Sequence, residues 1–237
     1  MWIGTFGGGL DLAIKEDDGY TFRHFFTKTF GQRRTRAIIE DSNGWIWVGN
    51  SDGVYVFSPD SLQTDPQNYL TYNYNNGKLR SNEIKCIYQD TRGRIWIGSS
   101  GGGLSMCIPG TDYRNLTFRH YGTSNGLVND MVQAIAEDKQ GNLWIATEYG
   151  ISRFNPETQA FDNYFFSAYT LGNVYSDNSS CVSKNGSLLF GTNYGLLVIN
   201  PEQMGNNSVL NSSITFTNLQ VNGISRIFLS CAISSLW

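Results

Sequence analysis

One pattern recurs along this chain and limits what it can fold into. "DSNGWIWVGN" begins at residue 41, "DTRGRIWIGS" at 90 and "DKQGNLWIAT" at 138, so each copy reads Asp-x-x-Gly-x-[Ile/Leu]-Trp-[Ile/Val]. "MWIGT" opens the chain at the same tryptophan, and "SKNGSLLFGT" from residue 183 carries Leu189 in its place. From Trp2 to Leu189 the successive steps are 45, 49, 48 and 45 residues. Such a period indicates a repeat protein.

Each full repeat contains four short strand signals, here called strands A to D. In the third complete copy they cover residues 132–138, 142–147, 150–155 and 160–166, with turn residues between them. Between strands A and B, the aspartate can accept hydrogen bonds from the turn backbone, and the glycine suits the last position of a type I turn. The turn lacks carboxylates at alternate positions, so it is not a calcium loop.

Glycines also recur between strands B and C. The copies are "FGGGL" at 6, "SDGVY" at 51, "SGGGL" at 100, "EYGIS" at 148 and "NYGLL" at 193. A phosphate-binding loop would be followed by a helix whose N-terminus faces the anion, whereas another strand follows here. We therefore predict hairpin turns with a glycine at positive φ in all five copies.

The two histidines raise the question of a metal site or a general base. His24 and His120 lie in "FRHF" and "FRHY" in strand D, and we align them with each other, with Asn73 and with Asn163. They are two repeats apart, and a group that recurs once per repeat and alternates with Asn is a structural copy. We predict no catalytic residue, no metal ligand and no cofactor.

A four-stranded antiparallel unit of this length is typical of a propeller blade. "WIWV" and "RIWI" in strand B are apolar on both faces, as a strand between neighbouring blades requires, and we expect the tryptophans to form core rather than to stack on sugars. The first unit begins at strand B, three units are complete, and the last has strands A to C. The predicted fold is all-β, a propeller arc of about four to five four-stranded blades in an incomplete ring; a small closed ring is the alternative.

Charge and composition exclude other classes. The net charge is −3 and the sequence pI is about 5.4, which argues against a nucleic-acid partner. No apolar run approaches the roughly 20 residues that a membrane helix needs, so we predict no membrane segment. Cysteines occur at four positions without a CxxC pair, and we predict buried free thiols, with disulfides or a metal as alternatives. These are Cys86, Cys107, Cys181 and Cys231.

The repeats resemble the two-component regulator propeller repeats in the periplasmic sensor region of hybrid histidine kinase/response regulators. The resemblance depends on "AIAEDKQGNLWIATEYGISRFNPET" (134–158) and on the connecting "YGTSNGLVNDMV" (121–132). "SKNGSLLFGTNYGLLVINPEQM" (183–204) looks like the last blade of that family. "ITFTNLQVNG" (214–223) looks like the first strand of its three-tyrosine, immunoglobulin-like domain.

The predicted organisation follows from this resemblance. Residues 1–201 are partial propeller repeats, 202–213 a linker and 214–223 the first strand of a truncated immunoglobulin-like domain. The tail, 224–237, fits neither that sandwich nor a spanning helix. A truncated or frameshifted reading frame would explain it.

The resemblance implies a function for the intact parent. It implies an oligosaccharide ligand, bound in the periplasm by a homodimer that shifts between signalling states, with the kinase outside this chain. This chain would therefore be a sensor fragment and not an enzyme. A protein-interaction propeller without small-ligand sensing is the alternative. A lyase or hydrolase would need convergent acid and base groups, and the carboxylates here mostly occupy repeated turn positions.

If strand A is innermost, the D-to-A and B-to-C loops share one rim. Tyr149 and Tyr194 occupy equivalent places there and could stack on sugar rings, although ordinary hairpin tips would look the same. The candidate ligand-binding residues are Tyr149, Tyr194, Arg33, Arg36 and Arg80. The same loops also carry Phe6, Arg34, Asp52, Lys78, Asn129 and Asp130.

Overall fold

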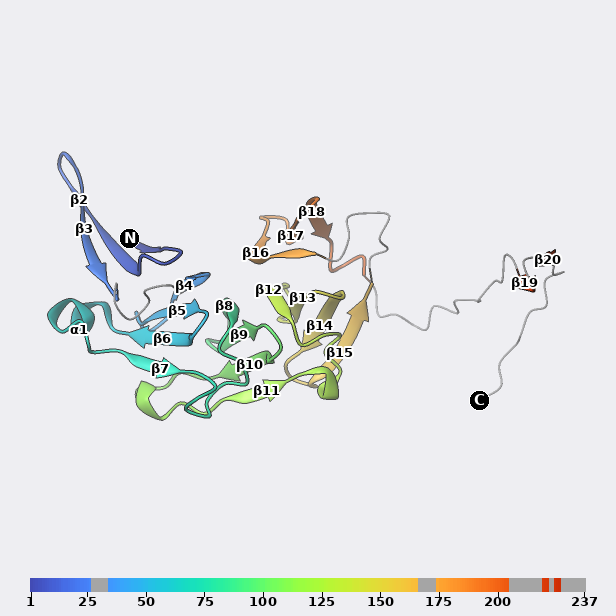
Figure 1. The fold of residues 1–237 in the computed structure, drawn as a ribbon, viewed down its shortest axis with the longest axis horizontal. Coiled ribbons are helices and arrows are strands. Elements are labelled where there is room, and N and C mark those ends of the chain that lie inside the picture. Colours follow the sequence, from blue (N-terminus) through green and yellow to red (C-terminus); the bar gives the residue numbers. More distant parts are fainter. Residues whose placement is uncertain (27–33, 166–173, 205–218, 222–223, 227–237) are drawn as a thin grey trace. The chain divides into compact units, whose positions relative to one another are not determined.

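The computed structural model describes residues 1–26, 34–165, 174–204, 219–221 and 224–226. The chain divides into two units, Met1–Pro201 and Glu202–Trp237. The described part of the first unit contains five antiparallel sheets, called blades 1 to 5 in chain order (Figure 1). No sheet pairs with another into a closed barrel or ring within these residues.

The blades have the strand content that the sequence predicts. Blade 1 has strands B to D: β1 (Trp2–Gly4), β2 (Leu10–Glu16) and β3 (Gly19–Phe25). Blade 2 has β4 (Ala37–Glu40), β5 (Ile46–Asn50), β6 (Gly53–Phe57) and β7 (Leu70–Tyr72), with α1 (Pro59–Thr64) between its strands C and D. Blade 3 has β8 (Ile84–Gln89), β9 (Ile95–Ser99), β10 (Gly103–Cys107) and β11 (Arg119–Tyr121).

The last two blades follow the same order. Blade 4 has β12 (Val132–Glu137), β13 (Leu143–Thr147), β14 (Ile151–Asn155) and β15 (Ala160–Tyr164). Blade 5 has strands A to C: β16 (Tyr175–Val182), β17 (Leu188–Thr192) and β18 (Gly195–Ile199). Two single 3-10 turns, Tyr113–Asn115 and Thr123–Asn125, precede and follow β11. The predicted all-β arc of blades, with three complete units between two partial ones, is confirmed.

Strand A is the inner strand of each blade from 2 to 5. The A strands of blades 2 to 5 contact one another, and β8 reaches β16 two blades away. Figure 1 shows β8 and β12 on the inner side of blades 3 and 4, with β11 and β15 on the outer side. The inner ends of the blades therefore meet along one axis.

The repeated aspartate joins the A–B turn to the tryptophan of strand B. Asp90 Oδ1 accepts hydrogen bonds from the backbone nitrogens of Arg92 and Arg94, at 3.0 and 2.9 Å. Its Oδ2 accepts the indole Nε1 proton of Trp96 at 2.7 Å. Gly93 donates to the Asp90 carbonyl at 2.9 Å and has φ 77°, where a side chain would be strained. One carboxylate thus holds the turn and orients the largest core ring of the blade.

The other complete blades repeat this arrangement. The indole nitrogens of Trp47 and Trp144 donate to Asp41 and Asp138 at 2.7 and 2.9 Å. In blade 5 both partners change together: Ser183 takes the turn position and Leu189 the ring position, so no buried carboxylate is left without its indole donor. Trp47, Trp96 and Trp144 are fully buried, which confirms the prediction that they are core.

Aromatic rings join neighbouring blades. Trp2 meets Phe57 of blade 2 at 5.2 Å between ring centroids, and Trp96 meets Phe154 of blade 4 at 5.7 Å. Phe57 and Phe154 share one register position on strand C, where blade 3 has Cys107 instead. The ring that meets Trp47 comes from Tyr113 in the following loop, at 6.1 Å.

In blades 2 and 3, the glycine two residues after the tryptophan of strand B lets the next blade approach closely. A Cβ on Gly49 would lie 2.7 Å from Ile84 Cγ2, and one on Gly98 would lie 2.5 Å from Val132 Cγ1. Both neighbours belong to the A strand of the following blade. The blade-to-blade contact is therefore close enough at this point to favour glycine.

The histidines are structural copies, as predicted, but the alignment with Asn73 is wrong. His24 and His120 face Asp11 and Ser105 across the C–D strand pair, with Nδ1 at 2.7 Å from Asp11 Oδ1 and 2.9 Å from Ser105 Oγ. The equivalent position in blade 4 is Asn163. In blade 2 it is Thr71, opposite Tyr55, because Tyr72 and not Tyr74 is the aromatic that ends strand D.

The positive φ predicted for every B–C glycine fails at one copy. The last glycine of the turn has φ 120° at Gly53, 67° at Gly103 and 149° at Gly195, but Gly150 has no positive φ. Gly150 is required by space instead, because a Cβ there would lie 2.8 Å from the carbonyl oxygen of Tyr164.

The prediction of buried free thiols holds for two cysteines. Cys86 and Cys107 are free and buried, whereas Cys181 is free and exposed, because the end of β16 in blade 5 is open to solvent. Burial raises the pKa of both inner thiols, that of Cys107 to about 12. Cys231 lies outside the described residues.

The second unit is described at two strands, β19 (Leu219–Val221) and β20 (Ile224–Arg226), which pair antiparallel. The predicted linker at 202–213, the immunoglobulin-like strand at 214–223 and the tail at 224–237 fall mostly outside the described residues. No helix within the described ranges is long and apolar enough to cross a membrane.

The Asp–Trp link can be measured by copying blade 5 into blade 4. Asp138→Ser and Trp144→Leu each leave one partner of a buried hydrogen bond behind, while the double variant removes both. We expect the double variant to retain about 1–2 kcal/mol more stability than the two single losses predict. Urea unfolding of the four proteins measures this coupling. Asp90→Ser combined with Trp144→Leu is the matched control and should be additive; additivity in the blade 4 cycle would disprove the link.

Candidate functional site

The D-to-A loops and the B–C turns form one rim, which we call the axial rim. The backbone nitrogen of Ser100 donates to Glu83 O at 2.9 Å, and that of Glu148 donates to Met131 O at 3.2 Å. Phe6 and Arg34 form an isolated antiparallel bridge. Each bond joins a B–C turn to a D-to-A loop, so the prediction that these loops share a rim is confirmed.

Strand A of blades 2 to 5 presents one polar side chain per blade at this rim. Arg36 immediately precedes β4, and Lys85 and Gln133 sit where the pairing register of β8 and β12 slips by one residue. Asp177 lies in the corresponding register slip of β16. A bulge turns an extra side chain out of the regular alternation. Polar groups therefore stand where the A strands converge.

Four of these charged groups form an ion-pair network, which we call the axial cluster: Arg36, Glu83, Lys85 and Asp177. Arg36 contacts Glu83 Oε1 through Nη2 at 2.6 Å and Asp177 Oδ2 through Nε at 2.9 Å. Lys85 Nζ lies 3.2 Å from the same Asp177 oxygen. The network links blades 2, 3 and 5, and its two cations balance its two carboxylates.

Buried polar atoms without a hydrogen-bond partner gather at the axial rim. Among the described residues, each lies at the start of strand A, the end of strand B or the end of strand D, and those strand ends all meet this rim. They are Thr35 Oγ1, Arg36 Nη1, Asn50 Nδ2, Gln133 Oε1, Tyr164 OH and Tyr175 OH. Leaving such a group unpaired costs about 1–3 kcal/mol. A cluster of them in one place points to a surface that is completed by water or by a polar ligand.

The two predicted tyrosines lie at equivalent tips of the axial rim. Tyr149 and Tyr194 are 61% and 73% exposed. Their backbone nitrogens donate to Thr147 Oγ1 at 3.3 Å and Thr192 Oγ1 at 3.2 Å. Tyr149 also meets Phe165 edge to face at 5.7 Å. Both rings are therefore held on short turns and exposed to solvent.

The predicted arginines do not share one environment. The Arg36 side chain is only 7% exposed, and its Nη2 and Nε are paired with two carboxylates. Its Nη1 is therefore the donor that remains available to a ligand. Arg80 is exposed and is not part of the axial cluster. Burial, with the charge of Arg80 as the second cause, lowers the pKa of His120. Arg33 lies outside the described residues.

Other predicted rim residues have structural partners. Asp130 Oδ1 accepts the Thr123 backbone proton at 2.8 Å, and the Asp130 carbonyl accepts from Gly101 and Gly103. Lys78 Nζ donates to Leu116 O at 3.1 Å. The Arg34 guanidinium lies 5.8 Å from the Phe6 ring centroid.

Of the axial cluster, only Arg36 was predicted from the sequence. The signal was present, because Arg36, Lys85 and Gln133 are separated by the same steps of 49 and 48 residues as Trp47, Trp96 and Trp144. Glu83 and Asp177 carry no such period, and only the folded chain brings them to Arg36.

Three segments match the family model described as two component regulator propeller: residues 30–52, 78–101 and 126–149. Each covers the D-to-A connection and the A–B hairpin of one of the three complete blades. The predicted family of these repeats is thereby confirmed. The predicted three-tyrosine domain after residue 213 has no match among these segments.

The chain is also similar in sequence or in fold to several known proteins. The chain is 26% identical over 183 residues to histidine kinase P4 of Formosa agariphila, which covers 76% of this chain and 13% of that protein. The extracellular domain of a protein assigned as a hybrid two-component system from B. thetaiotaomicron has a similar fold, with TM-score 0.67, 23% identity and coverage of 85% of this chain and 28% of that one. PorZ of Porphyromonas gingivalis, a component of the type-IX secretion system, gives TM-score 0.57 at 17% identity over 84% of this chain and 30% of that one. The chain thus spans less than a third of each of these relatives.

The axial cluster should contribute to stability. Arg36→Gln leaves Glu83 and Asp177 without their shared cation, and both are partly exposed, so we expect a loss of about 1–3 kcal/mol in the free energy of unfolding. Arg119→Gln, at an exposed arginine of β11, should change it by less than about 0.5 kcal/mol. Equal losses in the two variants, measured by urea unfolding, would show that the network contributes nothing specific.

Proposed function

Since three stretches of this chain are two-component regulator propeller repeats, we propose that residues 1–201 belong to the extracytoplasmic sensor region of a hybrid two-component regulator and bind an oligosaccharide at the axial rim. The histidine kinase would lie in the rest of a longer protein. In this proposal the location is periplasmic, and the intact regulator works as a homodimer.

The observation that carries this proposal is the composition of the axial rim. Two exposed tyrosine rings stand on the tips of neighbouring blades, and the described buried polar atoms without partners lie on the same rim. An oligosaccharide offers C–H faces that can cover aromatic rings and hydroxyl groups that both donate and accept hydrogen bonds. A rim with exposed aromatic rings and unpaired polar atoms therefore suits a ligand that has apolar faces as well as hydroxyl groups.

The carboxylates of the repeats favour binding over catalysis. Asp41, Asp90 and Asp138 are occupied by turn amides and by indole protons, so they are engaged in structure and are not directed at a substrate. General acid–base catalysis needs a pair of groups with access to one reacting bond.

In this proposal, the axial cluster couples ligand binding at the rim to the ion pairs that link the blades. Arg36 Nη1 is unpaired, while Nε and Nη2 of the same guanidinium bind carboxylates from blades 5 and 3. A ligand hydroxyl that engages Nη1 would alter the balance between these contacts. A ligand shifts a conformational equilibrium only if it binds the two states differently, and a shared guanidinium that links three blades can supply that difference.

Calorimetry on the 237-residue chain with a panel of neutral and acidic oligosaccharides tests the proposal. We expect heat with at least one of them. Tyr149→Ala and Tyr194→Ala should each weaken that binding by about tenfold, since stacking and hydrogen bonding at one ring contribute about 1–2 kcal/mol. Tyr20→Ala, at an exposed ring of β3 outside the axial rim, is the matched control.

Two results would contradict the proposal. One is binding that survives in the Tyr149→Ala, Tyr194→Ala double variant at full strength. The other is the absence of heat with every oligosaccharide, together with capture of a defined protein partner through the same rim; that result would favour the protein-interaction propeller.

A further inference from the structure

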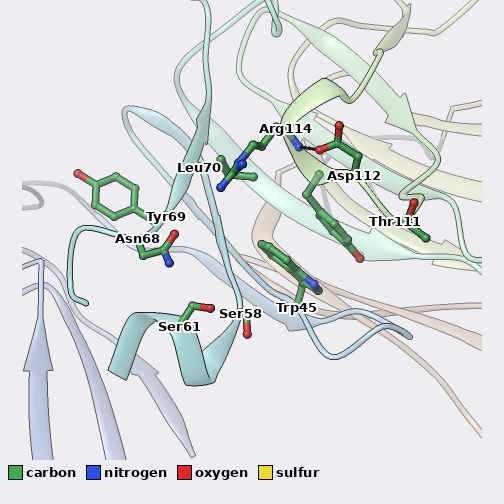
Figure 2. Close-up of a pocket in the computed structure, with 10 residues that line it drawn as sticks. Trp45, Ser58, Ser61, Asn68, Tyr69, Leu70, Thr111, Asp112 and Arg114 are labelled. Carbon is green, nitrogen blue, oxygen red and sulfur yellow. Dashed lines mark hydrogen bonds between the residues drawn. The ribbon is translucent and has the colours of Figure 1, made fainter. Parts of the chain in front are cut away.

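A cavity of about 250 Å³ lies between blades 2 and 3. Its residues come from the A–B turn and the C–D connections, and these loops are at the opposite ends of the strands from the axial rim. Figure 2 shows Asn68 and Tyr69 on one side of it, with Thr111 and Asp112 on the other. The cavity is therefore separate from the candidate site described above.

The floor of the cavity is aromatic and fixed. Trp45 and Tyr113 stack with 4.2 Å between ring centroids and 8° between ring planes. Tyr113 OH donates to Asp41 Oδ2 at 2.6 Å and accepts from Asn43 Nδ2 at 3.0 Å. The repeated turn aspartate of blade 2 thus holds a ring from blade 3. Tyr113 is buried and Trp45 is partly exposed, so the floor presents a rigid apolar surface.

The walls of the cavity carry unused hydrogen-bonding groups. Ser58 is the N-cap of α1 but makes no capping bond, although serine at this position ordinarily accepts one from the first turn. Within the described part of the chain, the side chains of Ser61, Asn68, Thr111 and Arg114 make no hydrogen bond to another residue. All five groups line the cavity.

One anionic group completes the lining. Asp112 accepts hydrogen bonds from Asn115 Nδ2 at 2.7 Å and from the backbone of Arg114 at 2.9 Å. The bonds from Asn115 and Arg114 hold the pKa of this carboxyl below its usual value. The wall therefore presents a donor-only guanidinium, an acceptor-only carboxylate, one amide and three hydroxyls, with no net charge.

We propose that this cavity binds one neutral pyranose ring. A pyranose has an apolar face for the Trp45 floor and several hydroxyls that donate to Asp112 and accept from Arg114 and Asn68. The volume is below the roughly 300–1,000 Å³ of pockets for drug-sized ligands, which matches a single ring. A uronate or sulfated sugar would be attracted by the Arg114 guanidinium but repelled by the Asp112 carboxylate. Because these two charges cancel, the wall favours an uncharged ring.

The test uses the 237-residue chain and three neutral probes: the methyl pyranosides of glucose, galactose and mannose. Saturation-transfer NMR detects binding, and a titration that follows the Trp45 indole resonance gives the affinity. We expect at least one probe to shift that resonance. The Asn68→Ala, Arg114→Ala double variant should weaken its binding by about tenfold or more. Both residues are exposed, so the fold should persist.

The controls separate this cavity from the axial rim. Gln67→Ala with Arg119→Ala removes an exposed amide and an exposed guanidinium outside the cavity, and should leave the affinity unchanged. Tyr149→Ala with Tyr194→Ala should also leave it unchanged. Loss of pyranoside binding in the tyrosine variant and its retention in Asn68→Ala, Arg114→Ala would overturn the inference while supporting the axial rim. No response to any of the three probes, or tighter binding of methyl glucuronide than of all three, would overturn it as well.

Discussion

The hydrogen bond from a tryptophan indole to an aspartate six residues earlier is the interaction on which the rest of this structure depends. In blades 2 to 4 the same carboxylate closes the A–B turn and orients the tryptophan ring of strand B. In blades 2 and 3 this ring also meets an aromatic ring of the next blade. Turn geometry and blade-to-blade packing are therefore coupled through one side chain. Because the coupling is local in sequence, each repeat can form it independently before the blades associate.

The fold was predictable because its determinants are local and periodic. The pattern around Trp47, Trp96 and Trp144 set the strand order, the partial blades at both ends and the equivalence of the two histidines. The alignment failed in blade 2, where Tyr74 was taken for the aromatic that ends strand D. A helix inserted between strands C and D changes the spacing there, and only the pairing register identifies Tyr72.

The candidate site was predictable only in part, for a physical reason. Exposed hairpin tips such as Tyr149 and Tyr194 follow from the repeat alone. The contact between Arg36 and Asp177 joins residues far apart in sequence, and it depends on a β-bulge that turns a side chain towards the axis. The cavity was harder still to predict from the sequence. Blade 3 has Cys107 at the strand C position where blades 2 and 4 have a phenylalanine, and the aromatic floor is formed by Tyr113 from the following loop.

The bond from Tyr113 to Asp41 has a consequence for how freely the blades can diverge. Blade 5 carries Ser183 and Leu189 as a pair where the complete blades have Asp and Trp. Blade 2 lacks this freedom, because the same exchange would also release a tyrosine that belongs to its neighbour. A change at Asp41 or Trp47 must therefore also be compatible with Tyr113 of blade 3, so the repeated aspartate has an added role at this one position in the array.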